Sequence, residues 1–144
     1  YNWAATANPN KLAPEGWDIP TQQDFSSLKT YIVPGADVTK PIKCGSYLKS
    51  TEGYWQSYTG ISRNNLTGFS GQPAGYRMYS IDEKAYSFDR FGSDAFFWSS
   101  TPYSGEDPLY RGSVYIMRLS YNMESSSQGP LGGQAGMSVR CIKR

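Results

Sequence analysis

The chain has 144 residues with a net charge of +2, and aromatic side chains make up 15% of it. This composition argues against disorder, because disordered chains have few aromatic residues and a high net charge. The basic residues are dispersed rather than gathered in a stripe, which argues against nucleic acid as a partner. No apolar run approaches the ~18 residues of a membrane span. The length fits a single domain, residues 1–144.

The first third of the chain contains one clear helix signal. Residues 1–13 are polar and small around two apolar side chains, and they predict an edge strand with a turn at 8–10. Thr21 is a suitable helix cap, and Asp24 three residues later completes a weak capping box. Apolar residues then recur at helical spacing as far as a proline–glycine pair, so we expect a helix over 20–33.

Strand patterns dominate the rest of the chain. Residues 63–75 are rich in Asn, Gly, Gln and Pro and predict an irregular loop, and residues 125–136 predict a turn region. The expected strands are 75–79, 86–91 with one buried face, 95–100 as a central strand, 113–121 and 137–142. One early helix followed by strands indicates an α+β fold with a mainly antiparallel sheet.

Two tryptophans and two cysteines are the expected structural residues. A chain with few aliphatic side chains must build its core on large rings, so we place Trp17 and Trp98 in the core. Cys44 and Cys141 either form one disulfide or remain as two buried thiols.

No motif indicates catalysis or a bound cofactor. The chain has no His, which removes the commonest general base and the commonest zinc ligand. The hydroxyls of residues 99–101 have no activating base close in the sequence, and the 12 Asp and Glu residues form no recognisable catalytic pair. We therefore expect no enzymatic activity, no metal and no cofactor.

A stretch rich in Tyr, Arg, Ser, Gly and Asn at residues 103–128 is the predicted ligand-binding surface. Tyr and Arg dominate the contacts at many binding surfaces, and Ser, Gly and Asn adapt to the partner. The candidate contact residues are Tyr103, Tyr110, Arg111, Tyr115, Arg118, Tyr121 and Asn122. Strand alternation also places Tyr115 and Tyr121 on one side with two apolar side chains, so a competing interpretation is that part of this set covers the core.

Four short fragments stand out along nearly the whole chain. They are LAPEGWDIPT at 12–21, GFS with PAGYR within 68–77, FWSST at 97–101 and SVRCI at 138–142. Together and in this order they resemble the Fibrobacter succinogenes major paralogous domain family. The resemblance implies a single C-type-lectin-like domain, distantly similar to formylglycine-generating enzymes. It also implies an exported, often lipid-anchored surface protein of gut or rumen bacteria.

The resemblance bears on the cysteines and on calcium as well. Some relatives have Cys at the position of Ala13, so here Cys44 is the only possible partner for Cys141. Sugar-binding lectins of this fold hold calcium with a Gln-Pro-Asp or Glu-Pro-Asn triplet, whereas Ala74 ends the corresponding triplet at 72–74 without a side-chain oxygen. Calcium-dependent sugar binding by that route is therefore disfavoured.

On this basis the expected function is non-catalytic binding of a protein or carbohydrate ligand at the cell surface, by a monomeric module of a larger exported protein. Related lectin-like domains are diversified near the C-terminus by retroelements, and residues 103–128 fit that pattern. Two alternatives remain open: a structural or adhesion module of a surface protein or pilus with no ligand of its own, and an enzyme akin to the formylglycine-generating group.

Overall fold

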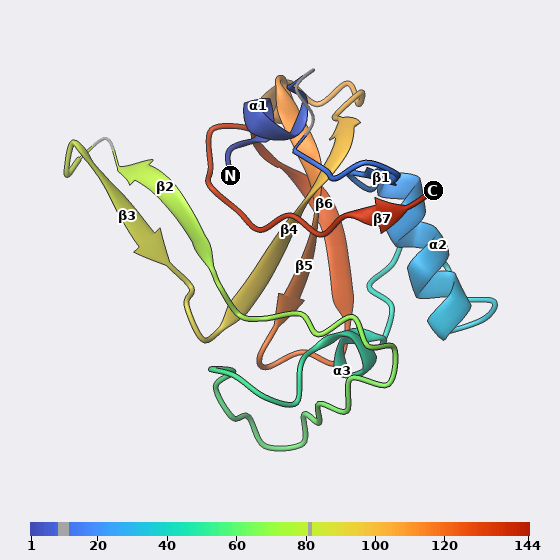
Figure 1. Ribbon diagram of the computed structural model, residues 1–144. Helices are drawn as coiled ribbons and strands as arrows, with labels where there is room; N and C mark the ends of the chain where they lie inside the picture. The colour runs from blue at the N-terminus through green and yellow to red at the C-terminus, as the bar shows by residue number, and fades with distance from the viewer. Residues whose placement is uncertain (9–11, 81) are drawn as a thin grey trace.

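A three-stranded antiparallel sheet runs through the middle of the molecule (Figure 1). Its strands are β4 (Asp94–Pro102), β5 (Ser113–Ser120) and β6 (Ser126–Gly132), with β5 in the centre. The computed structural model describes residues 1–8, 12–80 and 82–144, so part of the turn expected at 8–10 lies outside the described residues. With its few helices and mainly antiparallel pairing, the chain has the predicted α+β fold.

Both faces of this sheet are covered by apolar side chains. Successive residues of a strand point to opposite faces, so β4 and β5 each contribute to two clusters. The first cluster contains Phe25, Ile42, Cys44, Leu48, Trp55, Ala95, Phe97, Met117 and Leu119. The second contains Phe96, Trp98, Val114, Ile116, Ala135 and Met137. The alternation predicted for residues 113–121 is confirmed, but both faces are buried for most of the strand length.

The predicted early helix is α2 (Gln22–Ile32), and its N-terminus has the expected capping box. The backbone N–H of Asp24 donates to the Thr21 hydroxyl at 3.0 Å, and the backbone N–H of Thr21 donates to the Asp24 carboxylate at 2.8 Å. These bonds satisfy two amide groups that the helix itself leaves unpaired. Phe25 then anchors the helix in the first apolar cluster.

Three of the remaining elements differ from the sequence-based expectation. Residues 1–13 contain the short helix α1 (Trp3–Thr6), capped by Asn2, where an edge strand was expected. Residues 125–136 contain the strand β6, because hydrogen bonding to β5 outweighs their turn-like composition. Residues 137–142 form no continuous strand: Ser138 makes an isolated bridge to Phe97, and β7 (Ile142–Lys143) pairs with β1 (Trp17–Asp18).

Three smaller regions complete the chain. Helix α3 (Gly45–Leu48) lies between α2 and the irregular loop at 63–75. The 3-10 helix η1 (Pro108–Tyr110) lies between β4 and β5. Residues 63–75 contain no helix or strand, which confirms the predicted irregular loop. β4 lies beside β5 at one side of the sheet rather than in its centre, although isolated bridges from Gly75 and Ser138 cover its outer edge.

Strands β2 (Tyr76–Ser80) and β3 (Ala85–Asp89) form a hairpin that projects from the body of the molecule (Figure 1). Its base is held by two backbone hydrogen bonds between Arg77 and Gly136, at 2.8 and 2.7 Å. Gly75 precedes the hairpin at a φ of +64°, where a Cβ would collide with the backbone of residues 89–91. Every residue of β3 is exposed because the hairpin projects from the body of the molecule, so the expected buried face is wrong.

Of the two tryptophans expected in the core, Trp98 is buried and Trp17 is not. Trp98 is fully buried, and its ring nitrogen donates to the backbone oxygen of Tyr1 at 2.9 Å. Trp17 is 41% exposed, because it lies on the two-residue strand β1 at the surface, opposite Lys143. Cys44 and Cys141 are both free: Cys44 is buried against the Ser126 hydroxyl, and Cys141 is half-buried.

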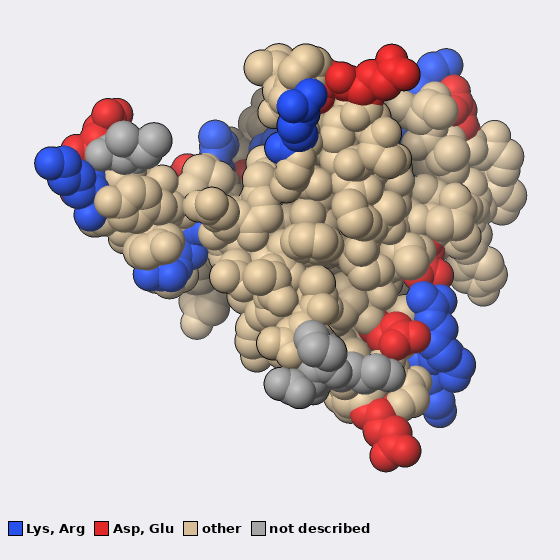
Figure 2. Space-filling model, turned by 90° about the horizontal axis from the view of Figure 1, so that it is seen from above, with Lys and Arg blue, Asp and Glu red and all other residues tan. Residues whose placement is uncertain are grey.

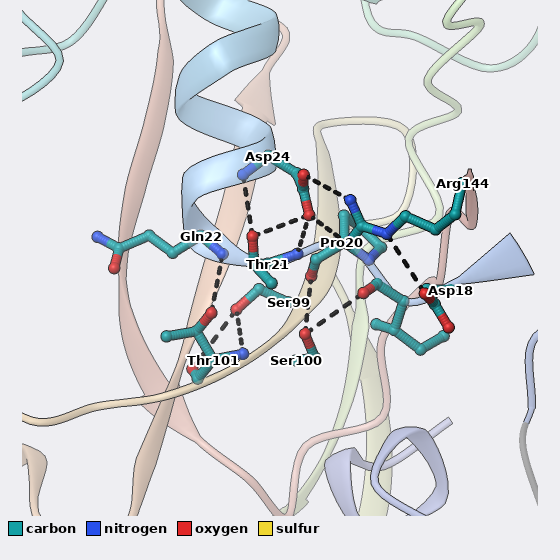
Figure 3. A network of polar contacts seen from close by, with 10 residues as sticks. Asp18, Pro20, Thr21, Gln22, Asp24, Ser99, Ser100, Thr101 and Arg144 are labelled. Carbon is teal, nitrogen blue, oxygen red and sulfur yellow. Dashed lines mark hydrogen bonds and ion pairs between the residues drawn. The ribbon is translucent and has the colours of Figure 1, made fainter.

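The start of α2 is tied to two distant parts of the chain (Figure 3). Arg144 holds the Asp24 carboxylate with two hydrogen bonds of 3.0 and 2.9 Å, and it also contacts Asp18 at 3.3 Å. On the other side, the Thr101 hydroxyl at the end of β4 accepts a hydrogen bond from the backbone N–H of Gln22 at 2.9 Å. The helix is therefore fixed to the central sheet and to the C-terminal residues.

The two tryptophans predict a clear difference in stability. Trp98→Ala should lower the free energy of unfolding by about 3–5 kcal/mol, because it leaves a cavity in a buried site. Trp17→Ala should lower it by about 1 kcal/mol or less, since much of the ring already meets water. Urea denaturation of the two variants measures both values, and a larger loss for Trp17→Ala would contradict the burial described above.

The Asp24–Arg144 contact predicts a pH-dependent contribution to stability. Hydrogen bonding from Arg144 lowers the pKa of Asp24 from 3.8 to about 2. A lowered folded-state pKa stabilises the fold above the ordinary pKa, and the contribution is lost as the pH falls toward 2. We expect Arg144→Ala to lower the urea midpoint at pH 7, and the difference from the unaltered protein to shrink between pH 4 and pH 2. A difference that stays constant with pH would assign the effect to packing instead.

Candidate functional site

The loop between β4 and β5 brings three of the predicted contact residues together. The Tyr103 ring lies 5.6 Å from the Tyr110 ring and 5.7 Å from the Tyr115 ring, between centroids. Such tilted and edge-on contacts are the favoured geometries of aromatic pairs. The Asp107 carboxylate accepts a hydrogen bond from the backbone N–H of Leu109 at 3.0 Å, which fixes the short helix η1 that presents Tyr110. We call Tyr103, Tyr110 and Tyr115 the tyrosine cluster.

The tyrosine cluster presents unsatisfied polar groups beside exposed apolar area. Leu109 is 86% exposed and Tyr110 is 39% exposed, and Arg111 follows them at the surface. Within the described residues, none of the three phenol hydroxyls has a hydrogen-bond partner, and Arg111 makes no ion pair. A ligand can therefore meet rings, hydroxyls and a guanidinium without first breaking an internal contact.

Three of the predicted contact residues, Arg118, Tyr121 and Asn122, lie toward the other end of β5. Tyr115 and Tyr121 are six residues apart, and a strand rises ~3.3 Å per residue, so they are separated by roughly 20 Å. Arg118, Tyr121 and Asn122 consequently do not belong to the tyrosine cluster. The sequence-based set of seven residues divides into two groups, one at each end of the central sheet.

The second group is largely engaged inside the protein. Arg118 donates to the buried carboxylate of Asp94 from two nitrogens, each at 2.8 Å, and its guanidinium lies over the Phe96 ring. The Tyr121 ring packs edge-on against Tyr58 at 5.7 Å and borders the first apolar cluster. The competing interpretation concerned Tyr115 and Tyr121: Tyr121 packs against the first apolar cluster, whereas Tyr115 belongs to the tyrosine cluster. Asn122 is exposed.

Asp94 is a buried charge that no sequence motif singled out. Burial by itself would raise its pKa, but hydrogen bonds from Ser120, Arg118 and Ser93 outweigh that effect and hold the pKa below its usual value. A carboxylate with this many donors stays ionised and keeps Arg118 in place. Asp94 and Arg118 therefore stabilise the fold rather than forming a reactive pair.

Lys49 is a second buried charge, with no exposed surface. Its amine donates to the backbone oxygen of Met123 at 2.6 Å and lies 5.6 Å from the centre of the Trp55 ring. Burial lowers the pKa of Lys49 to about 8. A lowered lysine pKa is common at reactive sites, but this amine is enclosed by protein and a large substrate does not reach it.

Sequence analysis missed a further exposed aromatic surface, on the β2–β3 hairpin. The register places Arg77, Tyr79, Tyr86 and Phe88 on one face of the hairpin, and we call them the hairpin face. The guanidinium of Arg77 lies 3.7 Å from the centre of the Tyr86 ring, and Phe88 is 78% exposed. Alternation in the sequence indicates that the two faces of a strand differ, but it does not show whether another element covers either face.

Charge is spread thinly around these surfaces. Figure 2 shows a broad uncharged area, with Lys, Arg, Asp and Glu of both signs scattered mainly along its edges. Among the described residues, no three His, Cys, Asp or Glu side chains gather as a metal site. No helix of the described chain is long and apolar enough to cross a membrane.

The family model of the Fibrobacter succinogenes major domain matches residues 1–143, and the chain belongs to this family. No curated protein and no solved structure matches the chain significantly. The resemblance noted from the four sequence fragments is thereby confirmed at the level of the family.

Proposed function

We propose that the chain is a non-catalytic ligand-binding domain with a C-type-lectin-like fold, displayed at the cell surface as part of an exported bacterial protein. Its ligand is a protein or a glycan, bound without a metal or other cofactor. The domain acts as a monomeric module of a larger protein, which a lipid anchor attaches to the cell.

The tyrosine cluster is the observation that supports binding most directly. Three rings pack on one another at the end of a buried sheet, which limits the side-chain entropy lost when a ligand docks. Tyr combines large contact area with a hydroxyl, and Arg111 adds a planar donor group beside it. Such a mixture suits the hydroxyls and C–H faces of a sugar as well as the polar surface of a protein.

The hairpin face favours a second candidate function. A projecting two-stranded hairpin with exposed rings is suited to docking against a neighbouring domain, as a structural or adhesion module would require. In that case the hairpin contacts another part of the assembled surface protein, and the domain needs no ligand of its own.

Binding to a glycan and surface-protein array separates the two functions. We expect the purified domain to bind a ligand on the array, and Tyr110→Ala/Arg111→Ala to abolish that binding while the melting temperature stays within about 2 °C, since both side chains lie at the surface. The matched control is Tyr86→Ala/Phe88→Ala on the hairpin face, which should still bind. Loss of binding only in the hairpin variant would move the site to the hairpin, and binding unaffected by either variant would contradict both locations.

A further inference from the structure

An apolar pocket of about 180 Å³ lies between α2, β7 and the loop that contains Phe69. Its apolar lining consists of Pro20, Phe25, Leu28, Phe69, Cys141 and Ile142. An enclosed apolar cavity of about 150 Å³ is large enough to hold a benzene ring. One six-membered ring therefore fits this pocket, with space left for a small substituent.

Two charged residues also line the pocket, and only one of them is available to a ligand. The Asp24 carboxylate is already held by Arg144 and by the capping contacts of Thr21 (Figure 3). Arg140 is exposed, and its guanidinium lies 5.1 Å from the centre of the Phe69 ring. It forms no ion pair with any acidic residue that the structure describes. The available charge beside this apolar pocket is therefore positive.

We propose that this pocket binds a small aromatic monocarboxylate, with the ring among the apolar side chains and the carboxylate against Arg140. Phe25 comes from α2 and Phe69 from the loop, and aromatic side chains in a lining favour an aromatic ring over an aliphatic chain through edge and face contacts. The planar guanidinium matches a carboxylate with two parallel hydrogen bonds. This site is separate from the tyrosine cluster, which shares none of its residues.

The rate of chemical modification of Cys141 can report whether the pocket is occupied. Cys141 lines the pocket and is half-buried, whereas Cys44 has no exposed surface and contacts the Ser126 hydroxyl at 3.0 Å. Iodoacetamide should therefore modify Cys141 in the native protein and spare Cys44. Intact-protein and peptide mass spectrometry measures the rate at each cysteine, and a ligand in the pocket should slow the reaction at Cys141.

The probes are benzoate, its neutral counterpart benzamide, and acetate, which has the charge without the ring. We expect benzoate to protect Cys141 in a saturable manner, and benzamide and acetate to protect it at least about threefold less effectively, because each lacks one of the two contacts. No protection by benzoate, or equal protection by benzamide, would overturn the proposal.

Three variants locate the contact. Arg140→Gln should raise the half-protecting benzoate concentration by about three- to tenfold, the range for loss of one charged contact near the surface. Lys84→Gln, which removes an exposed positive charge outside the pocket, should leave it unchanged. Leu28→Phe should fill the pocket and abolish protection without unfolding the protein, as its melting temperature reports. Equal shifts in Arg140→Gln and Lys84→Gln would show a general charge effect and contradict the assigned site.

Discussion

The structure depends on the burial of β4 and β5 on both faces. A strand covered on one side can alternate apolar and polar residues, but these strands must supply apolar side chains to two clusters. Polar side chains inside the sheet are then tolerated only where they are fully paired, as Asp94 is by Arg118, Ser93 and Ser120. Residues that could contact a ligand therefore lie at the strand ends, in the loops and on the projecting hairpin.

Local chemistry in the sequence predicted some elements well. The helix α2 follows from Thr21, Asp24 and the apolar spacing, all within a few residues of one another, and the structure contains that helix with its capping box. Strand β5 was equally clear because its alternation extends over eight residues. The family was identified from fragments spread along the chain, and its model matches residues 1–143.

The errors concern properties that depend on distant parts of the chain. β6 has a turn-like sequence and is a strand only because β5 offers it a hydrogen-bonding edge. Trp17 is a large ring and looked like a core residue, but its strand pairs at the surface. The seven candidate contact residues were close in sequence, yet a strand that crosses the molecule separates Tyr115 from Tyr121. Proximity in the sequence therefore grouped the three residues of the tyrosine cluster, but it also included residues that lie far from the cluster.

The buried sheet also explains how the proposed binding surfaces could vary without loss of the fold. The tyrosine cluster, the hairpin face and the pocket beside α2 all border the sheet or its flanking helix, and few of their side chains contribute to the two apolar clusters. The pocket shares most with them, since Phe25 belongs to the first cluster and Leu28 and Phe69 pack against it. Substitution elsewhere on these surfaces should change what is bound more than it changes stability.

Native-state hydrogen exchange tests most directly whether the central sheet is the most stable part of the domain while the surface elements open locally. Amides of β5 should exchange only when the whole domain unfolds, whereas those of the β2–β3 hairpin, which projects from the body of the molecule, should exchange at least about 100-fold faster through local opening. Addition of low urea concentrations should accelerate β5 but leave the hairpin nearly unchanged. If the hairpin amides were as slow as those of β5, the hairpin would be part of the cooperative core, and the division into frame and surface would be wrong.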